Sequence, residues 1–179
     1  AWDIALTVPQ GRSEIQRLVD IDGQSELYGR ILYAASYQGR IAAIDVTRGQ
    51  FLWARSFSSH TGVSVGKDAV YSSDDRSYIW ALDRNNGATL WKQDKLQARE
   101  VTLPVIYKDF LVVGDLEGYI HVMSRFDGRF VARTQVDADG ILVPPVVDGD
   151  RLLVLTRDGD LVAFTIREAA MYTDEELFD

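Results

Sequence analysis

An eleven-residue pattern occurs twice in this chain. AIDVTRGQFLW occupies residues 43–53 and ALDRNNGATLW occupies residues 81–91, and both read A-x-D-x-x-x-G-x-x-x-W. The second copy follows the first after 38 residues. Self-similarity at a fixed spacing of roughly 20 to 50 residues is typical of proteins built from stacked structural repeats. The pattern therefore favours a repeat architecture over a single irregular domain.

Further copies follow the first two. YSSDDRSYIWALDRNNGATLW (71–91) aligns with VVGDLEGYIHVMSRFDGRFVA (112–132) at a period of 41, and VLTRDGDLVAFTI (154–166) supplies a fourth copy, again at 41. Each copy holds short β-branched and aromatic runs separated by hairpin-turn pairs such as Asn86-Gly87 and Asp127-Gly128. A period of about 40 with four strands per copy predicts an all-β fold, a β-propeller of about four blades of four antiparallel strands.

The repeat also predicts where the strands and blades lie. Innermost strands are expected near 61–65, 101–106 and 142–147, second strands near 31–36, 69–73, 109–114 and 151–156, third strands near 40–46, 78–83, 119–124 and 160–165, and outer strands at 50–56, 88–93 and 129–136. The corresponding blades are 19–57, 58–95, 96–136 and a three-stranded blade at 137–166. Residues 1–18 would form the outer strand of a preceding blade plus a loop, with the strand at 1–6, and residues 167–179 an acidic tail.

The conserved letters of the motif have physical roles in such a blade. The glycine of each copy (Gly49, Gly87, Gly128) follows a tight turn, where a positive φ is favoured and a Cβ is penalised. The tryptophans Trp2, Trp53 and Trp91 offer large flat apolar rings that we expect to dock on the neighbouring blade. The third copy has Ala132 at the tryptophan position, so its docking contact should be weaker.

One segment departs from the pattern. Where later copies have LPVIYKD (103–109) and PPVVDGD (144–150), the first has SELYGR (25–30), which places Glu26 on an innermost strand that is apolar elsewhere. A lone carboxylate there is costly unless it is solvated or paired. We therefore expect residues 24–28 to be irregular or to face the central channel.

Composition excludes several classes of protein. With 46% apolar and 26% charged residues, the 179-residue chain can bury a sizeable core. A net charge of −8 argues against nucleic acid as a partner, and the absence of cysteine excludes disulfides and thiol chemistry in this segment. No apolar run approaches the roughly 18 residues of a membrane span, and residues 1–20 lack the features of a signal peptide, so any targeting segment is expected upstream of Ala1.

The residues that could carry chemistry are few. His60 and His121 lie 61 residues apart with no metal-ligand spacing, and we interpret them as a turn residue and a strand residue. The acidic stretches 115–118 and 137–140 lack the spacing of a calcium loop, so we interpret them as solvated turns. No catalytic, cofactor-binding or metal-ligating residue is predicted. Residues 167–179 contain a helix capping box at Thr173 and Glu176, and they are interpreted as a frayed terminus, with a short docking helix as the alternative.

Four stretches carry a resemblance to a known family: SEIQRLVDID (13–22), SYQGRIAAIDVTRGQFLW (36–53), VVGDLEGYIHVMSRFDGRFVARTQVDADG (112–140) and DGDLVAFTI (158–166). Across residues 31–166 the repeat resembles the tryptophan-docking motif of pyrroloquinoline-quinone-type propellers. Within that superfamily, the four stretches resemble the BamB family, the β-propeller lipoproteins of the outer-membrane β-barrel assembly machinery.

The resemblance implies a non-enzymatic scaffold with no cofactor, at the periplasmic face of the outer membrane. It implies binding to a POTRA domain of BamA, through acidic residues that match Asp20 and Asp22 here, with Arg17 in the same segment. Unfolded outer-membrane proteins are further expected partners, and membrane attachment would use only an N-terminal lipid anchor outside this chain. Two carboxylates separated by one apolar residue fall on the same side of an extended segment, where a partner's basic side chain can pair with both.

Other interpretations remain open. The same propeller could belong to a quinone-dependent dehydrogenase, or it could be the ligand-sensing domain of a larger receptor. Propellers of the resembled family have eight blades, and this chain supplies about half of such a ring. We therefore expect it to pair with another propeller half, because inter-blade apolar faces and strand edges would otherwise be exposed.

Overall fold

The protein is built entirely of β-strands over the residues that the structure describes. The computed structural model describes residues 2–6 and 23–166, and these contain fifteen strands in four antiparallel sheets and no helix. Accordingly, none of these residues belongs to a helix that is long and apolar enough to cross a membrane. The predicted all-β propeller architecture is confirmed at this level.

Each sheet, here called a blade, is a meander of strands in sequence order. Blade 1 contains β1 (Glu26–Tyr28), β2 (Ile31–Ala35), β3 (Gly39–Asp45) and β4 (Gln50–Phe57). Blade 2 contains β5 (Ser64–Val65), β6 (Ala69–Ser73), β7 (Ile79–Asp83) and β8 (Thr89–Gln93). Blade 3 contains β9 (Val105–Tyr107), β10 (Phe110–Gly114), β11 (Tyr119–Ser124) and β12 (Phe130–Gln135). Blade 4 contains β13 (Val146–Asp148), β14 (Arg151–Leu155) and β15 (Leu161–Phe164).

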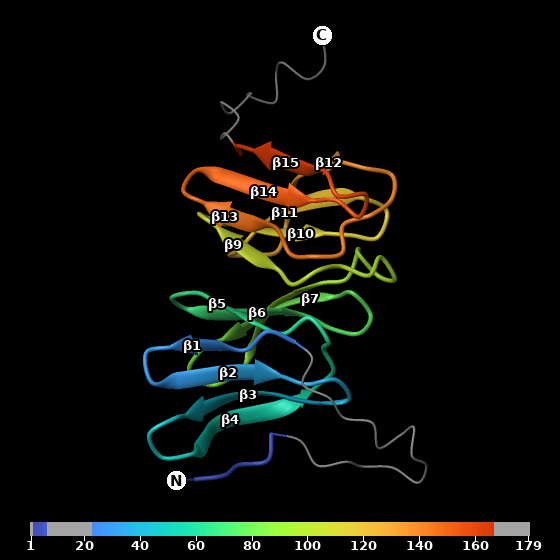
Figure 1. Cartoon of the computed structure of the whole chain (residues 1–179). Coiled ribbons are helices and arrows are strands. Elements are labelled where there is room, and N and C mark those ends of the chain that lie inside the picture. Colours follow the sequence, from blue (N-terminus) through green and yellow to red (C-terminus); the bar gives the residue numbers. More distant parts are fainter. Residues whose placement is uncertain (1, 7–22, 167–179) are drawn as a thin grey trace, which may run out of the picture.

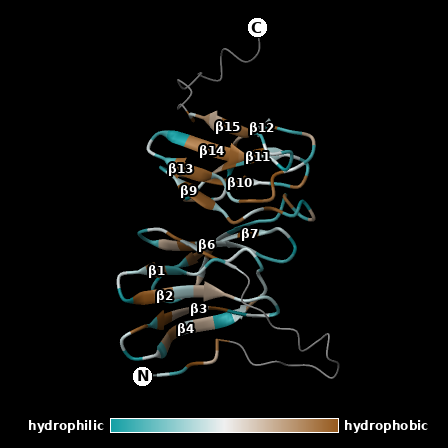
Figure 2. Cartoon of the chain, viewed as in Figure 1, coloured by the Kyte–Doolittle hydropathy of each residue, from teal (hydrophilic) through white to brown (hydrophobic). Residues whose placement is uncertain are grey.

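The blades follow one another along a stack, from β1–β4 at one end to β13–β15 at the other (Figure 1). Hydrophobic residues concentrate in the strands, and hydrophilic residues concentrate in the turns (Figure 2). The hydrophobic core is divided into clusters that lie between successive blades: one joins Tyr33 of β2 to Val70 of β6, and the next joins Tyr71 of β6 to Leu111 of β10. We call the contacts between blades 1 and 2, 2 and 3, and 3 and 4 the first, second and third junctions.

The innermost strands begin later than the sequence predicted. β5, β9 and β13 start at Ser64, Val105 and Val146, three or four residues after the predicted starts at 61, 101 and 142. In blades 3 and 4 the strand starts directly after a proline, which has no N–H to donate to a ladder. In blade 2 the preceding Gly62 has a φ of +96°, which is not an extended conformation.

The prediction that residues 24–28 would be irregular or face the channel was wrong. Residues 26–28 form β1, which pairs in regular antiparallel register with β2. The Glu26 carboxylate accepts a hydrogen bond from the backbone N–H of Val65 at 2.7 Å. The charge therefore has a partner on the neighbouring blade, which is how an innermost strand can tolerate it.

Residues 2–6 pack against the outer face of blade 1 without forming a strand, contrary to the strand expected at residues 1–6. Leu6 is buried in a cluster with Ala34, Ala42 and Ile44. No described strand lies beside residues 2–6 to complete a ladder with them. These residues lie at the β4 end of the stack, whereas β15 lies at the opposite end (Figure 1).

Candidate functional site

The tryptophan of one blade meets the turn of the next at both complete junctions. At the first junction, Trp53 donates its indole N–H to the carbonyl of Arg84 at 2.8 Å, and the Tyr33 hydroxyl reaches the same carbonyl at 3.3 Å. At the second junction, the same bonds run from Trp91 and Tyr71 to the carbonyl of Arg125, at 3.0 and 3.2 Å. Equivalent positions of the repeat therefore make equivalent bonds between blades.

The glycine of the motif is the surface on which the ring lies. Gly87 has a φ of +72°, and a Cβ built there would lie 2.6 Å from the ring of Trp53. Gly128 has the same φ, and its Cβ would lie 2.6 Å from the ring of Trp91. A side chain at either position would both strain the backbone and displace the ring. The glycine and tryptophan of the motif thus meet across each junction, from successive repeats.

Trp2 occupies the same kind of dock on blade 1. Its indole N–H donates to the carbonyl of Val46 at 2.9 Å, and its ring lies against Gly49. The side chain is 46% exposed, whereas Trp53 is 9% exposed. Ala132, at the tryptophan position of blade 3, is exposed and offers no ring.

The aspartate of the motif shapes the docking turn. Asp45 Oδ1 accepts the backbone N–H groups of Thr47 and Arg48 at 2.8 and 3.2 Å, and Asp83 accepts the equivalent pair in blade 2. The Thr47 amide, with lesser help from Arg48, lowers the pKa of the Asp45 carboxyl below its ordinary value. The carboxylate therefore holds the turn that presents the glycine.

A second repeated pair was missed by the sequence analysis. Asp74 Oδ2 accepts the indole N–H of Trp80 at 2.9 Å, and 41 residues later Asp115 Oδ2 bonds His121 Nε2 at 2.7 Å. In both blades the other oxygen of the aspartate accepts two backbone N–H groups of the turn that follows it. The spacing of six residues in both copies was the available signal. It was hidden because the ring residue changes from tryptophan to histidine.

Asp115 is the centre of a buried ionic cluster in blade 3. Its side chain is fully buried, and Arg99 bonds it through Nε at 2.5 Å while reaching Glu117 through Nη2 at 2.8 Å. Burial alone would raise the pKa of Asp115, but the bonds from His121, the Tyr119 amide and Arg99 outweigh it and hold the pKa below the ordinary value. The interpretation of 115–118 as a solvated turn was therefore wrong for Asp115, and His121 is not a lone strand residue.

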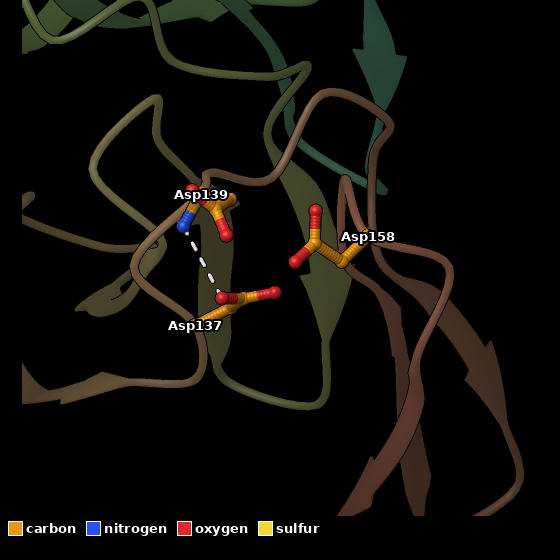
Figure 3. A group of neighbouring side chains, drawn as sticks. All are labelled: Asp137, Asp139 and Asp158. Atoms are coloured by element: carbon orange, nitrogen blue, oxygen red, sulfur yellow. Dashed lines mark hydrogen bonds between the residues drawn. The ribbon is translucent and has the colours of Figure 1, made fainter.

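Three aspartates gather at the turns of the third junction. Asp137, Asp139 and Asp158 bring carboxylate oxygens within 4.8 Å of one another, and the Asp139 N–H donates to Asp137 at 3.2 Å (Figure 3). The hydrogen bond with Asp139, and the repulsion between the two charges, raise the pKa of Asp158. Calcium sites in proteins use roughly six to eight oxygens. Three carboxylates on open turns fall short of that set.

Several predicted residues lie outside the part of the chain that the structure describes. Arg17, Asp20 and Asp22, proposed to contact a partner, fall within residues 7–22, and the acidic tail 167–179 with its alternative helix is also outside. His60 lies exposed in a bend between β4 and β5.

Stacked meander sheets joined by tryptophan-on-glycine docks define the molecule as a β-propeller of tryptophan-docked repeats. The model of the family described as "Outer membrane protein assembly factor BamB" matches residues 1–93 and 86–171. The chain belongs to this family.

Individual relatives agree with the family match. The outer membrane protein assembly factor BamB of Pseudomonas aeruginosa is 46% identical over 166 residues, covering 93% of this chain and 44% of the relative. The crystal structure of BamB from Moraxella catarrhalis superposes with a TM-score of 0.83 at 29% identity, covering 90% of this chain and 48% of that one. This chain thus spans less than half the length of these relatives.

More distant structures share the fold alone. The quinohemoprotein alcohol dehydrogenase of Comamonas testosteroni matches with a TM-score of 0.64 at 16% identity, over 76% of this chain and 29% of that chain. The dehydrogenase interpretation left open by the sequence therefore gains a shared propeller, and no shared site.

Proposed function

We propose that this chain is a non-enzymatic scaffold module in the assembly of outer-membrane proteins. The proposal is carried by one observation, the 46% identity over 93% of this chain to a relative named as an assembly factor. The junctions support it, because their conserved residues serve contact between blades. A rigid stack of blades is suited to hold loops in fixed positions for a partner. We place the chain's work at the periplasmic face of the outer membrane, with a lipid anchor supplied outside these residues.

The partner we propose is a POTRA domain of BamA, bound through the segment that contains Arg17, Asp20 and Asp22. Its two carboxylates, separated by one residue, suit a pair of basic side chains on a partner. Changing Asp20 and Asp22 together to arginine introduces repulsion at this rim, and we expect at least a roughly tenfold weaker affinity for the periplasmic part of BamA by isothermal titration calorimetry.

A charge-matched control separates local from general effects. Asp68 and Asp94 are exposed on blade 2, and arginine at both changes the net charge equally. We expect this control to bind within about twofold of the unchanged protein. Equal affinity for all three proteins would remove Asp20 and Asp22 from the site, and a fall in melting temperature of the Asp20/Asp22 variant would assign them a structural role.

We also propose that the open end of the stack is covered by another propeller half. Blade 4 exposes Val146, Leu155 and Leu161, at 60%, 44% and 68%, and the relatives are more than twice as long as this chain. Light scattering of this chain at micromolar concentration should give about twice 20.1 kDa if two copies supply the two halves. A stable, monodisperse species of 20.1 kDa would contradict pairing of this chain with itself.

A further inference from the structure

A groove opens at the outer side of the second junction. Its volume is about 430 Å³, and Lys95, Leu96 and Arg99 from the segment after β8 line it on one side. His121 of β11 and Phe130 and Arg133 of β12 line it on the other. The groove therefore combines an apolar floor with cationic walls.

The groove exists because the second junction lacks the aromatic packing of the first. At the first junction, β4 continues to Phe57, whose ring meets Trp80 edge-on at 6.0 Å, and Arg55 lies over the same indole at 5.7 Å. At the second junction the smaller His121 stands at the position of Trp80, and β8 ends at Gln93, so the segment that follows turns away from the sheet. The groove at the first junction is correspondingly smaller, at about 270 Å³.

The two grooves also differ in charge. Asp74 and Asp75 line the first groove together with its cations, whereas no carboxylate lines the second. Arg99 is already paired with Asp115 and Glu117. Lys95 and Arg133 make no ion pair with any residue of the described ranges 2–6 and 23–166. On a chain of net charge −8, this groove presents two cations that have no carboxylate partner.

Arg133 is held in place without being neutralised. Its guanidinium lies 4.7 Å from the centre of the Tyr119 ring, and that of Arg99 lies 5.4 Å from it. Stacking on a ring fixes the direction of a guanidinium while leaving its N–H groups free for a carboxylate. The buried bond between His121 and Asp115 fixes the floor beneath.

We propose that this groove binds an acidic peptide segment of a partner protein, in which a carboxylate side chain is adjacent to a large apolar one. The carboxylate pairs with Arg133 and Lys95, and the apolar side chain packs on Leu96 and Phe130. The two cations and the lack of a lining carboxylate select for negative charge, and the volume of about 430 Å³ accommodates one large side chain with its backbone. This site is separate from the segment 17–22 of the proposed function and does not depend on it.

The probe is a fluorescein-labelled synthetic hexapeptide with two glutamates followed by leucine and phenylalanine, flanked by glycines. Fluorescence anisotropy with the full chain should show saturable binding that weakens with added salt, because the contact is ionic. An analogue with glutamine in place of both glutamates should bind at least about fivefold more weakly. Equal binding of both peptides would overturn the charge-based recognition.

Matched variants locate the site. Arg133→Gln should weaken binding of the acidic peptide about fivefold or more, whereas Lys92→Gln should change it less than about twofold. Lys92 is the equivalent residue 41 positions earlier, and it lines the groove that contains aspartates. Both side chains are exposed, so unchanged melting temperatures will show that the variants fold.

Chemical-shift changes on adding the peptide should centre on the amides of Lys95, Leu96 and Arg133. If Arg133→Gln binds as the unchanged protein does, or if the shifts centre on another part of the molecule, the proposal is wrong. Equal loss in Arg133→Gln and Lys92→Gln would likewise overturn it, because it would indicate general attraction between opposite charges.

Discussion

The first and second junctions use the same dock and differ in what surrounds it. In both, a tryptophan and a tyrosine of one blade share a carbonyl of the next, and the ring lies on a glycine. Beside the dock, the first junction has the aromatic pair Phe57 and Trp80, whereas the second has His121 bonded to a buried Asp115. The repeat thus preserves the contact that joins blades and varies the layer at the rim.

The difference shows how a repeat protein can acquire distinct surfaces. A dock that recurs at every junction stabilises the stack irrespective of what lies beside it. The neighbouring position can then change from an apolar ring to a polar one, provided that the new polar group has a partner. Arg99 and Asp115 supply those partners at the second junction, and an open groove results.

The largest expected effect is at the most buried tryptophan. Trp53→Ala should lower the free energy of unfolding by about 3 to 5 kcal/mol, because it leaves a cavity in the first junction. Trp91→Ala should cost less, about 2 to 3 kcal/mol, since Trp91 is only partly buried. Trp2→Ala should cost less than about 1 kcal/mol because that ring is 46% exposed. Urea unfolding measures all three, and a cost at Trp2 equal to that at Trp53 would contradict this order.

The next effect separates the two rim arrangements. Asp115→Ala should cost about 3 kcal/mol, because it leaves Arg99 and His121 without their buried partner. Asp74→Ala removes the equivalent carboxylate at the first junction, where the neutral Trp80 is the ring donor, and should cost about 1 to 2 kcal/mol. Both are measured by urea unfolding at neutral pH. A larger loss at Asp74 would show that the ionic cluster contributes little.

The pH dependence of stability sharpens the same point. The folded-state pKa of Asp115 lies below its ordinary value of 3.8, so its contribution is fully present above pH 3.8 and is lost as the pH falls through the folded-state pKa. Asp115→Asn should therefore be less stable than the unchanged protein at pH 7, and the difference should shrink as the pH falls below about 4. Melting temperatures recorded from pH 7 to pH 2.5 test this, and a difference that does not vary with pH would exclude the ionised carboxylate as the cause.

The smallest effect is expected at the third junction. The pKa of Asp158 is raised by Asp139, so the folded state is penalised above that pKa, and the penalty disappears below the ordinary value of 3.8. Asp158→Asn should therefore slightly raise the melting temperature at pH 7 and leave it unchanged at pH 3. A decrease at pH 7 would show that the carboxylate has a stabilising partner.

The sequence predicted the recurring parts of the molecule. The spacing of glycine and tryptophan gave the repeat, and alternating apolar runs placed the second, third and outer strands within a few residues of β2, β3 and β4 and of their counterparts in later blades. These features depend on local periodicity and turn chemistry, which can be read along one strand at a time.

The parts that vary between blades could not be predicted in the same way. The partner of Glu26 is a backbone amide of the next blade, 39 residues away. Asp115 looked like a turn residue because its partner Arg99 comes from the preceding blade, and the change from Trp80 to His121 concealed the repeat of the pair. The groove depends on side chains of two blades, so only their placement in three dimensions reveals it.

The central claim is that the tryptophan of one blade and the glycine of the next couple neighbouring blades, and a double-mutant cycle at Trp53 and Gly87 tests it most directly. Gly87→Ala introduces a Cβ 2.6 Å from the ring, so in the unchanged background it should cost the strain of its positive φ and also displace Trp53. In the Trp53→Ala background only the backbone strain remains. Urea unfolding of the four proteins should give a coupling energy of at least about 1 kcal/mol, and costs that add within about 0.5 kcal/mol would contradict the claim.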